Sequence, residues 1–196
     1  SGKSTLLSIV ARLREPDRGR LRIVGTDVRD LKEKILRGMI GFAGAATPLL
    51  PGSIGMNLRY RAPKVSEHEL QRVISCCNID TIIARLPRGL DTRLGEGSPE
   101  LSSSERQRVE IGRAMMGRPE VLILDGVDTH LDEESALRIG LALGQYEGAV
   151  LMAATTPTLR QFATAIWCID NGTVRVNAGP ARRLGLVRNE RATELS

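Results

Sequence analysis

Aromatic residues are scarce in this sequence: phenylalanine, tryptophan and tyrosine together make up 3% of 196 residues. Proteins that hold single-stranded nucleic acid stack its bases on aromatic side chains. The net charge of +5 comes from basic residues scattered along the chain, apart from a mild cluster near the C-terminus. We therefore expect no nucleic-acid partner, and we assign the positive charge to a solvated surface that would suit anionic lipid headgroups.

Cysteine and long apolar runs are also lacking. Cys76, Cys77 and Cys168 have neither an even count nor the spacing of metal ligands, which predicts reduced thiols in a cytosolic protein. Cys76 and Cys77 fall in a predicted helix, where neighbours are expected to point to different faces. No apolar run approaches the roughly 20 residues that cross a bilayer, and no signal peptide is recognised. The composition, 41% apolar, predicts a soluble globular chain with one packed core.

The first motif present is SGKSTLL. Gly2, Lys3 and Ser4 match the second half of the phosphate-binding pattern GxxxxGK[ST]. In that pattern backbone N–H groups cradle phosphates, the lysine reaches the β and γ oxygens, and the hydroxyl holds Mg²⁺. The apolar spacing of TLLSIVARL predicts a helix, whose N-terminus favours an anion; a capped helix start without phosphate is the alternative. The first glycine and the strand before it would lie upstream, so we expect a fragment of a longer protein.

Strand and helix patterns alternate along the rest of the chain. Strands are predicted from Arg20 to Val24 and in the segments MIGFAG, VLILD, AVLMAATT and AIWCIDNGTVRV. One helix begins at Ser66 with a capping box to Glu69. A second starts with the serine-rich cap of LSSSE and stops at Gly117 and Pro119. A third is capped by Asp132, with Glu133 and Glu134 in its first turn. Alternation of this kind predicts an α/β protein with a mainly parallel sheet, interrupted by a mainly helical insertion.

The order SGKSTLL, TPLLPGSIGMNLRY, TRLGEG, LSSSERQRVEIGRAMM, PEVLILD, THLD and AVLMAATT resembles the ATP-binding cassette of ABC transporters. PGSI followed by NLRY, and TRLGEG before the serine-rich helix, resemble the exporter branch. The resemblance implies a P-loop NTPase fold, with a RecA-like core at 1–45 and 116–196 whose N-terminal part is missing. The inserted helical subdomain would span 46–115 and carry the signature helix. The aromatic residue that stacks on adenine in the family would lie before residue 1.

The resemblance also implies roles for individual residues, with ATP and Mg²⁺ as cofactors. The phosphate-binding residues would be Ser1, Gly2, Lys3, Ser4 and Thr5. Ser4 would bind magnesium directly and Asp125 through water, as hard oxygen donors suit this ion. Asp132 would lie in the loop that crosses to a partner cassette. The signature facing the partner's ATP would be Leu101, Ser102, Ser103, Ser104 and Glu105.

Several hydrolytic residues of the family are replaced. Gly126 stands where the family has the glutamate that polarises water, Ala45 where it has the magnesium-sensing glutamine, and Thr156 where it has the histidine that contacts the γ-phosphate. In the signature, Ser103 and Ser104 replace two glycines, and Glu105 adds an anion where the family has an amide, which is unfavourable beside phosphate. Loss of a general base alone costs roughly 10² to 10⁴ in rate. We expect ATP binding with slow or no hydrolysis.

Two neighbours were considered as substitutes for the missing glutamate. Asp128 lies two positions beyond Gly126, and His130 lies in the crossing loop. An offset of two residues moves a carboxylate by several ångströms, about 3.3 Å per residue in extended chain, and catalytic placement tolerates far less. We interpret Asp128 as a turn residue and His130 as a surface or interface imidazole.

The resemblance implies an exporter cassette at the cytoplasmic face of a membrane, paired with an identical or a different cassette. A transmembrane domain would be fused upstream or lie on a separate chain, and ATP binding would drive or gate transport. The alternatives are a regulatory or scaffold pseudo-ATPase and an inactive fragment of an ABC protein. Because the damaged core and the damaged signature lie on one chain, pairing with an intact cassette would leave neither composite site fully equipped.

Overall fold

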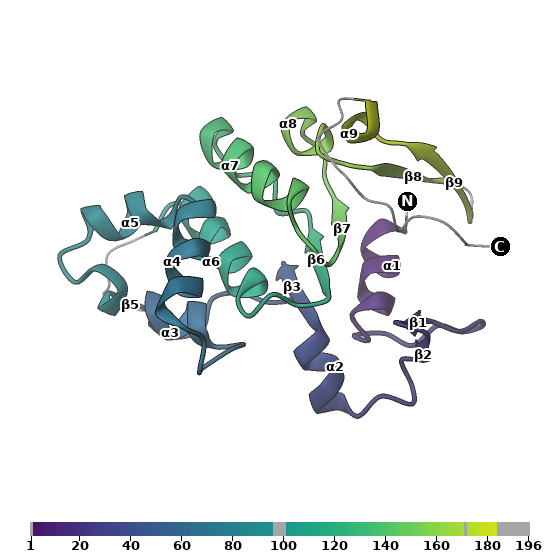
Figure 1. The fold of residues 1–196 in the computed structure, drawn as a ribbon, viewed down its shortest axis with the longest axis horizontal. Helices are drawn as coiled ribbons and strands as arrows, with labels where there is room; N and C mark the ends of the chain where they lie inside the picture. Colours follow the sequence, from purple (N-terminus) through teal and green to yellow (C-terminus); the bar gives the residue numbers. More distant parts are fainter. Residues whose placement is uncertain (1, 96–100, 171, 184–196) are drawn as a thin grey trace.

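The computed structural model describes residues 2–95, 101–170 and 172–183 (Figure 1). The elements are α1 (Lys3–Val10), β1 (Arg22–Ile23), β2 (Thr26–Asp27), α2 (Glu33–Met39), β3 (Ile40–Gly44), β4 (Gly52–Ser53), α3 (Ile54–Arg59), α4 (Glu67–Cys76), α5 (Ile79–Arg85), a 3-10 turn η1 (Gly89–Asp91), β5 (Arg93–Leu94), α6 (Ser103–Met115), β6 (Val121–Asp125), α7 (Glu133–Gly144), β7 (Ala149–Ala153), α8 (Pro157–Arg160), β8 (Ala165–Asp170), β9 (Thr173–Ala178) and α9 (Pro180–Arg183). Ser1 and the end of TRLGEG, residues 96 and 97, lie outside the described residues.

A parallel sheet of three strands, in the order β3, β6, β7, forms the centre of the fold. Ile40 pairs with Val121, which pairs in turn with Ala149, so the three strands start and end level with one another. The middle strand β6 is buried along VLIL, as expected for a strand covered on both faces. The predicted α/β class with a parallel sheet is confirmed.

The two faces of β6 pack against different helices. Val121 and Ile123 face one apolar cluster, which contains Leu7 and Val10 of α1. The alternate residues of the strand join a second cluster with the helices α6 and α7, and Figure 1 shows these helices on the opposite side of the sheet from α1. Since successive strand residues point to opposite faces, one short strand ties the two clusters together.

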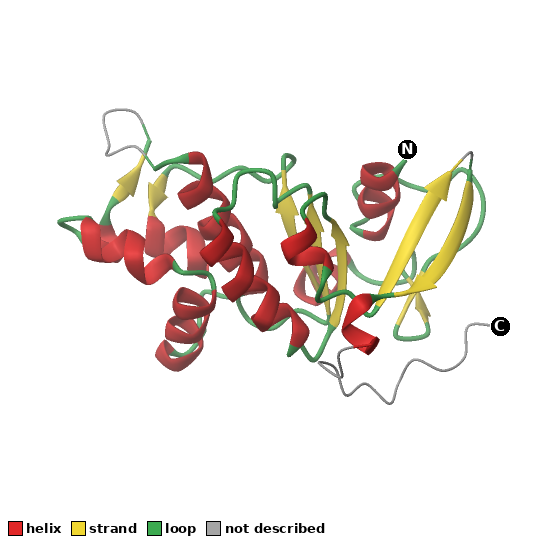
Figure 2. Cartoon of the chain, turned by 90° about the horizontal axis from the view of Figure 1, so that it is seen from above, coloured by secondary structure: helices red, strands yellow, loops and turns green. Residues whose placement is uncertain are grey.

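The helices α3 to α5 and the small β4–β5 pair lie beside the sheet, next to α6 (Figures 1 and 2). Their apolar side chains belong to the same cluster that covers the α6 face of the sheet. Arg61 fastens this part to β3, because its Nε donates to the carbonyl of Ile40 at 3.0 Å and its Nη1 to that of Met116 at 2.9 Å. The division into 46–115 and a core stays a prediction.

Two antiparallel hairpins lie outside the central sheet. The turn between β1 and β2 is made by Val24 and Gly25, both with positive φ, 50° and 78°, as a tight two-residue hairpin loop requires. At the end of the molecule away from α5, β8 and β9 pair with each other (Figures 1 and 2). No helix among residues 2–95, 101–170 and 172–183 combines the length and the apolar character of a membrane span.

Two predictions at the ends of α4 were wrong. At the N-terminus, Ser66 Oγ accepts the N–H of Glu69 at 3.2 Å, but the reciprocal bond of a capping box is missing because the Glu69 carboxylate binds Arg72 and Arg118 instead. At the C-terminus, Cys76 and Cys77 do not point apart: their sulfurs lie 3.9 Å from each other. The helix ends at Cys76, and Cys77 leaves helical geometry with φ −94° and ψ 8°.

Candidate functional site

The phosphate motif folds as a glycine turn that opens a helix. Gly2 has φ 76°, a conformation that suits glycine, and its carbonyl accepts the first helical hydrogen bond from the N–H of Leu6 at 3.0 Å. Lys3, Ser4 and Thr5 form the exposed first turn of α1, which contains no acidic residue. The N–H groups of a first turn have no partner within the helix, so this end can receive an anion.

Ser4 and Asp125 meet although 121 residues separate them. Ser4 Oγ donates to Asp125 Oδ1 at 3.1 Å, where the first turn of α1 faces the end of β6. Mg²⁺ prefers hard oxygen donors and commonly keeps bound waters. A hydroxyl and a carboxylate side by side therefore fit the donor chemistry of a magnesium site, with the hydroxyl as a direct ligand and the carboxylate acting through water.

The three replaced hydrolytic positions gather at one edge of the sheet. Gly44, Asp125 and Ala153 are paired across the three strands at their carboxyl ends. Ala45 and Gly126 follow directly, and Thr156 comes three residues after β7. Ligands bind at this edge in open parallel sheets. Here these positions supply a methyl group, a hydrogen and a hydroxyl, so none of them has the carboxylate, amide or imidazole of the family.

Gly126 is also set apart by its backbone. Its φ is 66°, and its N–H donates to the carbonyl of Ala153 at 3.1 Å, which fixes the turn at the end of β6. A Cβ added here would meet no atom within 4 Å. Space therefore allows a side chain at Gly126, whereas the left-handed backbone disfavours one.

Asp128 anchors the loop that follows β7. Its side chain is buried, with 1% of the residue exposed, and Oδ2 accepts the N–H groups of Thr155 and Thr156 at 2.6 Å each. Burial on its own raises the pKa of Asp128, but these hydrogen bonds outweigh it and hold the pKa below its usual range. Asp128 is thus more than a turn residue: its charge positions the loop that contains Thr156.

His130 lies at the surface, where its exposed ring agrees with the interpretation as a surface imidazole. Its Nδ1 lies 3.2 Å from Thr129 Oγ1, and its backbone N–H donates to Gln107 Oε1 at 3.3 Å. Neither of these contacts is made to an acidic side chain.

The signature helix α6 starts with a complete capping box. Ser102 Oγ accepts the N–H of Glu105 at 3.2 Å, and Glu105 Oε2 accepts the N–H of Ser102 at 2.8 Å. Arg85 adds an ion pair to Glu105 at 2.7 Å. Burial raises the pKa of Glu105, yet the Ser102 and Arg85 contacts outweigh it and lower the pKa. Glu105 is thus an anion paired with Arg85 within the chain, and its unfavourable effect beside a partner's phosphate stays a prediction.

Ser104 joins the signature to the crossing loop. Its Oγ donates to Asp132 Oδ2 at 2.7 Å, while Asp132 Oδ1 caps α7 by accepting the N–H of Ser135 at 2.8 Å. Burial favours the neutral acid, but the hydrogen bonds from Ser135 and Ser104 outweigh it and lower the pKa of Asp132 to about 2. Ser104, which by the predicted correspondence replaces a family glycine, thus donates a hydrogen bond to one oxygen of the Asp132 carboxylate in the crossing loop.

Arg113 is a residue that the sequence interpretation missed. It lies in α6, and its guanidinium donates to the carbonyls of Thr47 and Pro48, at 2.9 Å for Pro48, in the loop just after Ala45. Burial lowers the pKa of Arg113, which the neighbouring Glu110 partly offsets. The sequence signal that could have found it is an arginine on the apolar side of a helix. A charged side chain is buried there only when hydrogen-bond acceptors surround it.

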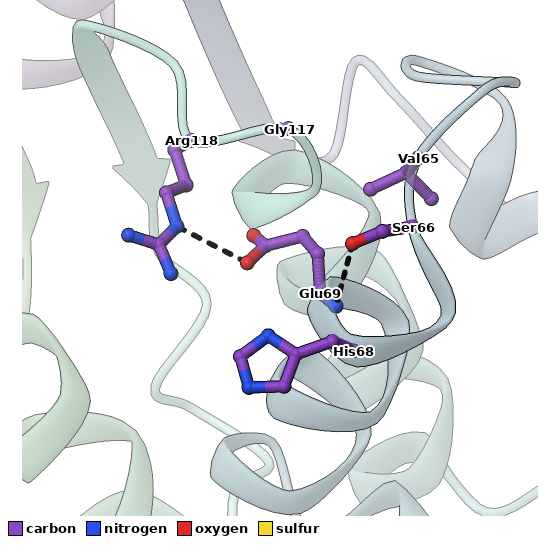
Figure 3. A pocket seen from close by; sticks show the side chains of 6 residues that line it. All are labelled: Val65, Ser66, His68, Glu69, Gly117 and Arg118. Carbon is purple, nitrogen blue, oxygen red and sulfur yellow. Dashed lines mark hydrogen bonds and ion pairs between the residues drawn. The ribbon is translucent and has the colours of Figure 1, made fainter.

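A separate pocket lies between the start of α4 and the turn after α6 (Figure 3). It is lined by Val65, Ser66, His68, Glu69, Gly117 and Arg118. The carboxylate of Glu69 is held by Arg118 at 3.1 Å and Arg72 at 2.6 Å. Because its acid is already paired and none of the phosphate or magnesium residues line it, this pocket is not part of the candidate site.

Comparison with known proteins gives consistent matches. A family model described as ABC transporter matches residues 1–128. The chain is 33% identical, over 94% of its length, to the uncharacterised ABC transporter ATP-binding protein y4gM of Sinorhizobium fredii (strain NBRC 101917 / NGR234). It is 37% identical, over 72% of its length, to the ATP-dependent lipid A-core flippase of Desulfotalea psychrophila (strain LSv54 / DSM 12343).

Among solved structures, a bacterial Atm1-family ABC exporter with ATP bound superposes with a TM-score of 0.80 and 28% identity, covering 93% of this chain. The chain spans 32% of that exporter and 32% and 25% of the two relatives. It therefore corresponds to about a third or less of each.

Proposed function

The chain belongs to the ABC transporter family, as an exporter-type nucleotide-binding domain, and from this we propose that it binds Mg-ATP with weak or absent hydrolysis. Paired with a second cassette, of the same or another kind, it would hold ATP at the shared interface and drive or gate transport at the cytoplasmic face of a membrane. Ligand bound between two domains stabilises their association without being hydrolysed.

The contact of Ser4 Oγ with Asp125 Oδ1 at 3.1 Å is the observation that carries the proposal. It supports a retained magnesium site beside the first turn of α1, where Lys3 would reach the phosphates. When bound, the ion would neutralise phosphate charge. In this chain the side chains would bind and orient the nucleotide: Ser4 and Asp125 through the metal, and the α1 N-terminus through its N–H groups.

The surroundings of the γ-phosphate support weak turnover. A water in line for attack needs an acceptor at its side, and Gly126 has no side chain to offer. Asp128, the next carboxylate after Gly126 in the sequence, uses Oδ2 for the N–H groups of Thr155 and Thr156 and is buried. Moving it toward water would leave two donors unpaired, so it is a poor substitute for the missing glutamate.

The transport role rests on family membership and on the relatives. The chain spans 25% of the lipid A-core flippase and 32% of the Atm1-family exporter. We propose that a transmembrane domain works with this cassette, fused to it or as a separate chain. The alternatives are a regulatory or scaffold pseudo-ATPase, or an inactive fragment, and a chain that dimerises without ATP would favour the scaffold.

Calorimetric titration with ATP, with and without Mg²⁺, tests the binding step. Lys3→Ala removes a charge-assisted contact worth roughly 1.5 to 3 kcal/mol, so affinity should fall by about ten-fold or more. Asp125→Asn should weaken the gain that Mg²⁺ gives while changing metal-free binding little. The matched control is Lys64→Ala, another exposed lysine far from this site in the sequence. Equal ATP affinity in Lys3→Ala and Lys64→Ala would refute the assignment.

A further inference from the structure

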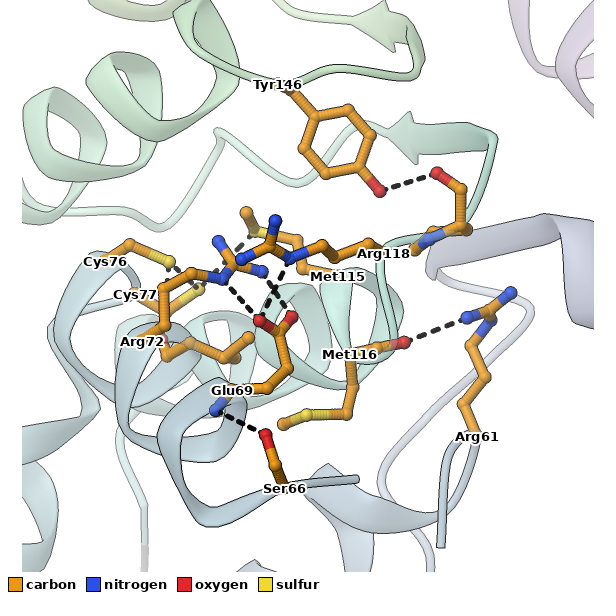
Figure 4. A network of polar contacts seen from close by, with 12 residues as sticks. Arg61, Ser66, Glu69, Arg72, Cys76, Cys77, Met115, Met116, Arg118 and Tyr146 are labelled. Atoms are coloured by element: carbon orange, nitrogen blue, oxygen red, sulfur yellow. Dashed lines mark hydrogen bonds and ion pairs between the residues drawn. The ribbon is translucent and has the colours of Figure 1, made fainter. Parts of the chain in front are cut away.

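Three sulfur atoms meet where α4 and α6 end (Figure 4). Cys76 Sγ lies 3.9 Å from Cys77 Sγ, and Cys77 Sγ lies 3.8 Å from Met115 Sδ. Cys77 and Met115 are fully buried, and Cys76 is partly exposed. Figure 4 shows the three side chains turned toward one another. Nothing in the proposed ATP chemistry uses this sulfur cluster.

The separations match those of ligands around a metal ion. Sulfur ligands ~2.3 Å from a common ion lie about 3.8 to 4.0 Å apart in tetrahedral or trigonal geometry. Both measured separations, 3.9 and 3.8 Å, fall in or at this range. An ion could therefore bridge Cys77 and either neighbouring sulfur with little movement of the two helices, which matters because a packed interior resists displacement.

The donor set selects the kind of ion. Within the part of the chain that the structure describes, no three histidine, cysteine, aspartate or glutamate side chains group as metal ligands. The third donor here is instead the thioether of Met115. Thiolate and thioether together favour Cu(I), whereas zinc takes cysteine, histidine or carboxylate ligands, usually four of them. We propose that Cys76, Cys77 and Met115 form a three-sulfur binding site for a soft monovalent cation of the Cu(I) type.

Charge and protons balance in this site. Binding one Cu(I) to two thiols and one thioether releases two protons to solvent and leaves one net negative charge on the complex. Arg72 and Arg108 lie near enough to favour the thiolates. Arg108 is buried, and its hydrogen bonds go to neutral oxygens of Asn78, Thr81 and Ser135. Its charge is thus available to compensate a negative complex.

Cys76 is the partly exposed sulfur of the three, whereas Cys77 and Met115 are fully buried. An ion that enters from solvent would therefore meet Cys76 first.

Anaerobic titration with Cu(I), in competition with a chromophoric Cu(I) chelator, tests this site. The protein and a Cys168→Ser control, which alters an exposed cysteine elsewhere, should each take one Cu(I). Cys76→Ser and Cys77→Ala should lose that equivalent. Met115→Leu conserves core volume and should raise the Cu(I) dissociation constant by about ten-fold or more, as removal of a direct ligand costs at least what outer-shell changes cost.

X-ray absorption at the copper edge gives an independent measurement. The loaded protein should show three sulfur ligands at ~2.3 Å, and Met115→Leu should show two. The proposal is overturned if the protein does not compete with the chelator, if Cys76→Ser binds as tightly as the control, or if Met115→Leu leaves both affinity and sulfur number unchanged. Because Met115→Leu is a conservative core change, its result stands even where Cys77→Ala fails to fold.

Discussion

Ser104 Oγ donates a 2.7 Å hydrogen bond to Asp132 Oδ2, which joins the start of α6 to the start of α7. By the predicted correspondence with the family motifs, the serine stands in place of a glycine, and the aspartate would lie in the loop that crosses to a partner cassette. The replaced signature and the crossing loop are therefore linked within one chain, and a partner would meet a carboxylate that already has hydrogen-bond donors.

The first prediction concerns this bond. Ser104→Gly should lower the free energy of unfolding by about 1 kcal/mol more than Ser103→Gly does, because both variants put glycine in the first turn of α6 but only one removes a hydrogen bond to Asp132. Urea unfolding of both variants measures the difference. Equal destabilisation would show that the bond to Asp132 contributes nothing to stability.

A second prediction concerns pH. The pKa of Asp132 is lowered from 3.8 to about 2, so its contribution to stability is present above about pH 4 and is lost as the pH falls toward 2. Asp132→Asn keeps a capping side chain but does not titrate. The difference in unfolding free energy between the protein and this variant should shrink between about pH 4 and about pH 2, the range set by these pKa values. A difference that stays constant over this range would contradict the assignment.

The third prediction is that Gly126→Glu does not restore rapid hydrolysis. Ala45 and Thr156 leave the water and γ-phosphate unsupported, and groups that act as a unit are not repaired one at a time. Phosphate release should be compared with a variant that carries all the family residues. It combines Gly126→Glu, Ala45→Gln, Thr156→His, Ser103→Gly, Ser104→Gly and Glu105→Gln. If the single change already reaches the rate of this variant, glycine was the only defect.

The backbone at Gly126 gives that experiment its control. With φ at 66° and open space around it, any side chain there meets strain from the backbone alone. Gly126→Ala should lose about 1 kcal/mol of stability, and Gly126→Asn less, because asparagine tolerates this conformation better. Thermal unfolding of these variants separates the backbone effect from any gain that the glutamate carboxylate would give.

The fourth prediction concerns Asp128. Asp128→Ala should destabilise the protein by about 3 kcal/mol, because it leaves the buried N–H groups of Thr155 and Thr156 without their acceptor. Asp17→Ala, at an exposed turn aspartate, serves as the control and should change stability by less than about 0.5 kcal/mol. Denaturant midpoints of the two variants decide this, and similar small shifts would show that Asp128 does not anchor the loop.

Local signals in the sequence were enough for the central elements. The run VLIL predicted a buried strand because its length and apolar content permit little else, and β6 ends at Asp125 as expected. Asp132 predicted the start of α7 and the serine-rich segment LSSSE that of α6, since a capping side chain acts within three residues of its own position. Motif order then indicated the P-loop architecture.

Contacts between distant segments were harder to predict. The hydrogen bonds of Asp128 to the loop after β7 depend on two parallel strands lying side by side, and the sequence near Asp128 contains no signal that predicts them. The meeting of Cys76 and Cys77 depends on where α4 ends, and helix ends are the least regular part of a helix. The balance of Glu105 by Arg85 needs a fold that brings two helices together.

Arg61 and Arg113 connect the helical part of the chain to the central sheet by hydrogen bonds. Arg61 holds carbonyls of β3 and of the turn after α6, and Arg113 holds the loop that follows Ala45. A guanidinium is planar and presents its donors in a fixed fork, so one side chain can hold two carbonyl groups at once. We therefore expect a tilt of α6 to displace the loop after Ala45 as well.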